Sequence, residues 1–100
     1  MIKHVVMWKL KDSAEGLSRD ENADLLTKKL LALYGVIPEL KSIQVGKDVT
    51  HGNGSYDLCL ITEFDDVAAM KTYNDCPAHQ AVLTYIRKVI EVRIACDFEE

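Results

Sequence analysis

Apolar and polar side chains alternate in four stretches of the chain, which is the pattern of β-strands. The first is residues 2–10, IKHVVMWKL, and both of its faces have apolar centres. The same alternation predicts strands over residues 41–50, 56–64 and 90–98. Residues 51–55, HGNGS, predict a tight turn between the second and third strands, because Asn-Gly supplies positive φ angles. Gly46 inside the second strand predicts a bulge or a close backbone approach.

A first helix is predicted after a charged loop. Ser18 and Glu21 have the S-x-x-E spacing of a capping box. Apolar residues then recur at helical spacing, and Gly35 followed by Pro38 is typical of a helix end. The apolar stripe of this helix is expected to face the core.

A second helical region is interrupted by a proline. An amphipathic run begins at residues 65–66, where an aspartate supplies the N-cap, and continues through Tyr73. Pro77 then favours the first turn of a new helix, capped by Asp75 or Cys76. Tyr73 and His79 therefore lie on opposite sides of the helix break, only a few residues apart.

The order of these elements is β-α-β-β-α-β, which predicts one ferredoxin-like α+β domain over residues 1–100. This arrangement has a four-stranded antiparallel sheet with the helices on one face. The first and last strands are then antiparallel neighbours. His4 and Asp97 are expected to lie side by side and to form a hydrogen bond.

The predicted sheet has a second face that the helices cannot cover. Val5 and Met7 point to that face, and the third strand is apolar on both sides. An exposed apolar sheet of this size is rare in a monomer. We therefore expect a homodimer in which two sheets pack face to face about a two-fold axis.

Composition and charge narrow the possible functions. The net charge is −4 and the basic residues are scattered, which argues against nucleic-acid binding. No apolar run has the length of a membrane span, and we read no signal peptide, so a cytoplasmic location without membrane association is expected. The three cysteines form no C-x-x-C pair, which is typical of reduced thiols. The three histidines lack zinc-site spacing, so neither a metal nor another cofactor is expected.

The candidate chemistry lies in residues 70–82, MKTYNDCPAHQAV. A phenol and an imidazole meet across the helix break, and one donor and one base are the minimum for proton transfer at a carbonyl compound. Tyr73 and His79 are therefore candidate catalytic residues. The alternative is a capped helix joint with a buried, hydrogen-bonded histidine. His4 and Asp97 likewise serve either a pocket or the stability of the core.

Taken together and in order, several segments resemble the stress-responsive A/B-barrel family of small dimeric α+β barrels. These segments are IKHVVMWKLKD, IPEL, VGKDVT, F-D-D, the tyrosine, C-P-A-H and C-D-F, and they span essentially the whole chain. The resemblance implies the fold and the dimer described above. Many members of the family have no defined chemistry.

One branch of the family, a plant polyketide cyclase, closes a linear tetraketide thioester by aldol condensation. Its tyrosine and histidine match Tyr73 and His79, and its strand-one histidine and strand-four aspartate match His4 and Asp97. Its pocket histidine aligns with Asp57, where this chain carries a carboxylate instead. The resemblance thus implies four catalytic candidates, with Asp57 and also Trp8 as candidates for the pocket wall; Trp8 is alternatively a core residue.

Three functions remain open from the sequence. The first is a stress-associated homodimer that binds a small molecule between sheet and helices without turnover. The second is a lyase or cyclase acting on a β-keto, polyketide-like substrate through Tyr73 and His79. The third is an oxygenase like those of the related dimeric barrels, and only the predicted fold supports this function. An enclosed cavity lined by both Tyr73 and His79 would favour the second.

Overall fold

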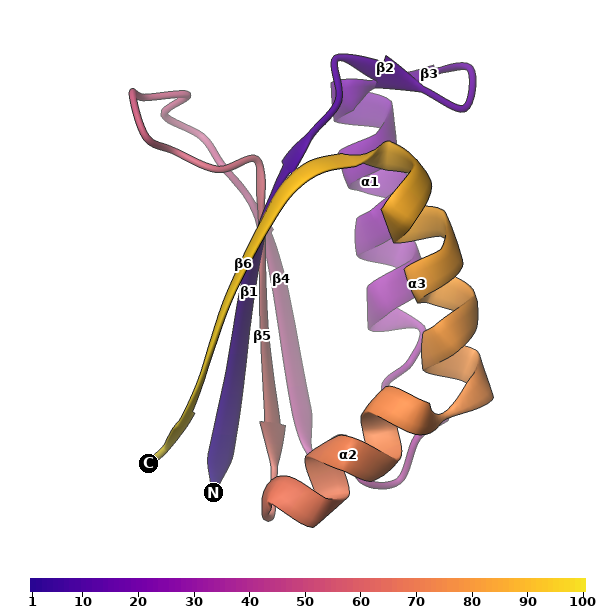
Figure 1. Cartoon of the computed structure of the whole chain (residues 1–100), viewed down its shortest axis with the longest axis vertical. Coiled ribbons are helices and arrows are strands. Elements are labelled where there is room, and N and C mark those ends of the chain that lie inside the picture. The colour runs from indigo at the N-terminus through magenta and orange to yellow at the C-terminus, as the bar shows by residue number, and fades with distance from the viewer.

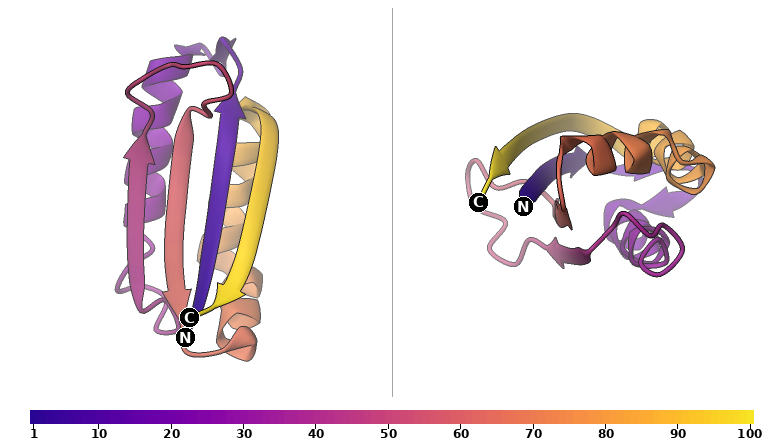
Figure 2. Two further views of the ribbon diagram at one scale, coloured as in Figure 1. Left: turned by 90° about the vertical axis from the view of Figure 1, so that its left-hand side faces the viewer. Right: turned by 90° about the horizontal axis from the view of Figure 1, so that it is seen from below.

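The computed structural model describes residues 1–100, and its central element is a four-stranded antiparallel sheet (Figure 1). The strands lie in the order β4-β5-β1-β6, as seen side by side in Figure 2. Their bounds are Ile2–Leu10 for β1, Ser42–Lys47 for β4, Leu58–Phe64 for β5 and Ile90–Glu99 for β6. Three helices cover one face of the sheet (Figure 1): α1 (Arg19–Leu31), α2 (Val67–Asp75) and α3 (Pro77–Val89). The predicted ferredoxin-like α+β fold is confirmed.

Helix α1 begins as predicted and ends early. Glu21 N donates to Ser18 Oγ at 3.2 Å, and Ser18 N donates to Glu21 Oε1 at 3.0 Å, which completes the capping box. The helix ends at Leu31, before Gly35, because the following backbone forms tight turns. Leu33 is buried within these turns, so the apolar stripe continues beyond the last helical residue.

The joint between α2 and α3 follows the sequence prediction closely. Asp66 caps α2, where its carboxylate accepts from Ala69 N at 2.8 Å. Pro77 is the first residue of α3, and Cys76 lies between the helices in an extended conformation. Cys76 makes no capping hydrogen bond through its side chain. Proline thus ends one helix and starts the next without losing a backbone hydrogen bond.

The connections between strands differ from the predicted ones. Strands β4 and β5 are joined by the loop 48–57 instead of a tight turn, and the positive φ angles fall at His51 and Gly54. The pairing of β4 with β5 runs through Gly46 without a register shift, so the predicted bulge is absent. The charged loop after β1 contains a small hairpin, β2 (Ser13–Ala14) and β3 (Leu17–Ser18), which turns at Glu15 and Gly16 with positive φ.

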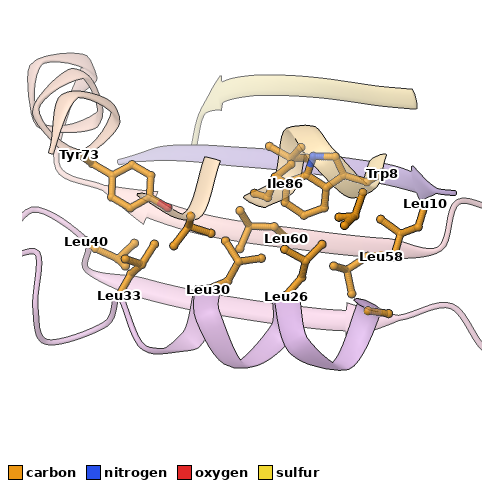
Figure 3. Close-up of a cluster of buried hydrophobic side chains, with 14 of the residues drawn as sticks. Trp8, Leu10, Leu26, Leu30, Leu33, Leu40, Leu58, Leu60, Tyr73 and Ile86 are labelled. Carbon is orange, nitrogen blue, oxygen red and sulfur yellow. The ribbon is translucent and has the colours of Figure 1, made fainter. Parts of the chain in front are cut away.

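The two faces of the sheet have different surroundings. On the inner face, side chains such as Trp8, Leu58 and Leu60 pack against the helices in one apolar cluster (Figure 3). On the outer face, Ile94 and Phe98 of β6 remain 41% and 43% exposed. None of the helices is both long and apolar enough to span a membrane. The single chain therefore has one buried sheet face and one open apolar face.

Candidate functional site

Tyr73 and His79 meet at the joint between α2 and α3. Their ring centroids are 4.3 Å apart, and the rings are inclined by 45°. Tyr73 is fully buried and His79 is 8% exposed. Phe64, at the end of β5, also contacts the phenol, with a centroid distance of 4.9 Å. The helix break therefore does bring the phenol and the imidazole together.

The hydrogen bonds of His79 fix its tautomer. Nδ1 lies 3.2 Å from the carbonyl oxygen of Asn74, which can only accept, so the proton is on Nδ1 and the lone pair is on Nε2. Burial lowers the pKa of His79 below 6.5; the Asn74 hydrogen bond opposes this shift, and the positive groups of His4, Arg87 and Arg93 reinforce it. His79 is accordingly a neutral imidazole with an available acceptor.

Two buried donors have no hydrogen-bond partner. One is the hydroxyl of Tyr73, and the other is the indole Nε1 of Trp8. Burial raises the pKa of Tyr73 to about 12, so this hydroxyl remains protonated. Buried polar groups in native proteins are rarely left unpaired. Both donors therefore lack an acceptor within the chain.

A cavity of about 290 Å³ lies between the inner face of the sheet and α3. Trp8 and Leu60 line it from the sheet, and His79, Leu83 and Ile86 line it from the helix. Tyr73 is not part of the wall, although its ring contacts His79. The wall of the cavity thus includes the imidazole and the indole but not the phenol.

His4 and Asp97 are directly opposite each other on β1 and β6. His4 Nδ1 donates to Asp97 Oδ1, which confirms the predicted hydrogen bond. Neither residue lines the cavity. Because Asp97 is bound by His4, the four catalytic candidates form two pairs, His4–Asp97 and Tyr73–His79.

Asp57 was expected on the pocket wall, and the structure places it elsewhere. It precedes β5 in the loop 48–57, and its backbone N–H donates to the carbonyl of Trp8 at 2.9 Å. Its Oδ2 accepts from the backbone N–H of Leu10 at 2.7 Å and lies 3.9 Å from Arg19 Nε. Asp57 therefore ties the loop to the end of β1, outside the cavity lined by Trp8 and His79.

The sequence interpretation missed several polar residues of the cavity. Arg93 stands opposite Trp8 in the pairing of β6 with β1, and Arg87 projects from α3. The remaining polar lining residues are Asn74, Asp75 and Gln80. The alternation in β6 could have identified Arg93, because it puts Arg93 on the same face of the sheet as Asp97. No group of three or more His, Cys, Asp or Glu side chains is arranged to hold a metal ion.

Comparison with known families agrees with this fold. The sequence model of the stress responsive A/B barrel domain matches residues 2–100. The chain belongs to this family. An uncharacterized family relative from Streptomyces coelicolor is 34% identical over 100 residues, which are 99% of each chain.

Two further relatives bear on function and assembly. Olivetolic acid cyclase from Cannabis sativa is 31% identical over 80 residues, covering 78% of this chain and 75% of the cyclase. A crystal structure from Bacteroides fragilis, described as a dimeric protein of unknown function with a ferredoxin-like fold, superimposes with a TM-score of 0.85. It is 26% identical, and the match covers 99% of this chain and 95% of that one.

Proposed function

We propose that this stress responsive A/B barrel protein binds a small carbonyl compound in the cavity between the sheet and α3. The observation that carries the proposal is that one cavity is lined by two residues with unused hydrogen-bonding groups, a donor on one and an acceptor on the other. Trp8 Nε1 is buried without a partner, and His79 keeps the lone pair of Nε2. The volume of about 290 Å³ is at the small end of ligand pockets.

A cyclase or lyase reaction is the second candidate. Nε2 of neutral His79 can remove an acidic proton next to a carbonyl, and the Tyr73 hydroxyl can donate to the developing oxyanion. The contact between the two rings and the similarity to olivetolic acid cyclase support this reading. Because Tyr73 is not on the cavity wall, the geometry favours binding over turnover.

We also propose that the protein is a homodimer through the outer face of the sheet. This face carries Val92, Ile94 and Phe98, all more than one third exposed, and a hollow of about 450 Å³ lined in part by Met7 and Cys59. Apolar surface of this kind is typical of an interface. The dimeric relative from Bacteroides fragilis supports the same assembly.

A cytoplasmic role in stress responses completes the proposal. The three cysteines are free, which suits a reducing compartment. The family description names stress responsiveness. Neither point depends on whether the cavity supports turnover.

Trp8 allows a direct test of binding because it is the only tryptophan in the chain. Benzoylacetone, a small β-diketone, is expected to quench Trp8 emission in a saturable manner. Leu83→Phe should abolish saturation by filling the cavity, whereas Leu31→Phe, on the exposed side of α1, should not change it. Quenching that does not saturate, or that survives in Leu83→Phe, would overturn the assignment of the cavity.

A separate assay tests the cyclase. The protein is incubated with the N-acetylcysteamine thioester of a linear poly-β-keto acid, and cyclised products are followed by mass spectrometry. Turnover that is lost in both Tyr73→Phe and His79→Asn would support the reaction. Absence of turnover in the wild type, together with saturable binding of benzoylacetone, would leave a binding protein.

A further inference from the structure

Two exposed arginines at the cavity have no ion-pair partner within the chain. Arg93 lies on β6 opposite Trp8, and Arg87 lies on α3 two turns after His79. Both line the cavity, and the side chain of neither makes a hydrogen bond or salt bridge within the chain. The third arginine, Arg19, is paired with Asp12. The unpaired guanidinium groups are therefore concentrated at one site.

The other polar groups of the cavity do not neutralise these charges. Asp75 is the single acidic residue in the lining, and it forms no ion pair with either arginine. His79 Nδ1 and Gln80 Nε2 both donate to the Asn74 carbonyl, so these donors are already used. Arg87 and Arg93 line the same cavity as His79, and their positive charges help to lower the pKa of His79. The cavity thus has an excess of positive charge beside a neutral base.

A second observation also indicates an acceptor-rich ligand. Trp8 lines the same cavity and is only 2% exposed, and its buried Nε1 donor lacks a hydrogen-bond partner. Around these donors the wall is apolar, with Leu60, Leu83 and Ile86 among its residues. A ligand that suits this lining has an apolar body and a negatively charged end.

We propose that the natural ligand of the cavity carries a carboxylate, which Arg93 and Arg87 bind at the mouth. The planar guanidinium fork matches the two oxygens of a carboxylate. The apolar part of the ligand then packs on Trp8 and Ile86, and its carbonyl-bearing part reaches His79. This inference rests on the proposed binding function and specifies the substrate class as a free acid instead of a neutral ester or thioester.

A matched pair of probes tests the charge requirement. The probes are 4-phenylbutanoate and 4-phenylbutanamide, which share an apolar body and differ in charge. Binding is followed by Trp8 emission. The wild type should bind the carboxylate about tenfold more tightly than the amide, because charge-assisted hydrogen bonds are stronger than neutral ones.

Substitutions then assign the effect to the arginines. Arg93→Met keeps an unbranched apolar stem and removes the guanidinium group, and it should weaken carboxylate binding about fivefold, the size expected for a partly exposed ion pair. Binding of the amide should not change. Arg87→Met should behave in the same way, and Arg19→Met is the control because Arg19 lies outside the cavity. Circular dichroism confirms that each variant is folded.

The outcomes separate this inference from the function on which it rests. Equal affinity for the two probes, or undiminished carboxylate binding in both Arg93→Met and Arg87→Met, would overturn the carboxylate assignment and leave the binding cavity intact. If neither probe binds the wild type and benzoylacetone does not bind either, the proposed function fails and the inference fails with it.

Discussion

Tyr73 and His79 are in ring contact across the break between α2 and α3, with their centroids 4.3 Å apart. The two residues differ in how well their polar atoms are satisfied. His79 Nδ1 is bonded to Asn74, whereas the hydroxyl of Tyr73 has no partner at all. A buried hydroxyl without a partner costs stability, so the Tyr73 hydroxyl does not stabilise the fold through a hydrogen bond.

Removing the hydroxyl of Tyr73 should therefore not weaken the fold. We expect Tyr73→Phe to leave the free energy of unfolding unchanged or to raise it by up to about 1 kcal/mol, because no hydrogen bond is lost. Urea denaturation followed by circular dichroism measures the effect.

Tyr85 provides the matched control for this prediction. Its hydroxyl donates to the buried Asn22 Oδ1 at 2.5 Å, so Tyr85→Phe should cost about 1–3 kcal/mol. A loss of stability in Tyr73→Phe as large as that in Tyr85→Phe would show that the Tyr73 hydroxyl is paired in solution.

His79 should make the stability of the protein depend on pH. Burial holds its pKa below the unfolded value of 6.5, so the unfolded chain takes up the proton first as the pH falls. Stability is then full above about pH 6.5 and declines below it until the folded pKa is reached. His79→Asn keeps a donor for the Asn74 carbonyl and should reduce this decline.

Two measurements check the protonation state. Unfolding of the wild type and of His79→Asn is compared at about pH 7.5 and about pH 5, where the wild type should show the larger loss. An NMR titration of the imidazole should show the neutral, Nδ1-protonated form at pH 7. A fully protonated His79 at that pH would contradict the assignment.

The pairings that depend on strand register were predictable from the sequence. Once the element order gives antiparallel end strands, His4 can face only residues near Asp97, and the hydrogen bond follows. The position of Pro77 similarly determines where α3 begins, because proline fits the first turn. Both features depend on local chemistry or on topology alone.

The position of Asp57 and the content of the cavity were not predictable in the same way. Asp57 precedes β5, and its backbone and carboxylate bond to β1, which is a tertiary contact that alternation does not encode. For Arg93, alternation gives the correct face of β6. Whether an acidic side chain lies close to Arg93 depends on the packing of α3. The volume of the cavity depends on the same packing.

Asp57 should affect stability and not binding. Asp57→Ala leaves the buried N–H of Leu10 without its acceptor, so we expect a loss of about 1–3 kcal/mol in the free energy of unfolding. The exposed pairing with Arg19 adds little. Asp57→Asn retains an acceptor oxygen and should be milder. Affinity for benzoylacetone should stay constant in both variants. A large change in affinity would show that Asp57 is part of the binding pocket.

The open sheet face gives the prediction for assembly. Met7 lies on this face, where β1 pairs it with Cys59 on one side and Ile94 on the other. A lysine at this position would put an unpaired charge into the apolar interface, at a cost of several kcal/mol. We expect Met7→Lys to sediment as a folded monomer, whereas Leu60→Lys, in the core and 3% exposed, should unfold. Sedimentation velocity at micromolar concentration decides the matter for the wild type as well: a species of 11.3 kDa would exclude the dimer, since the open face would then be stable in water without a partner.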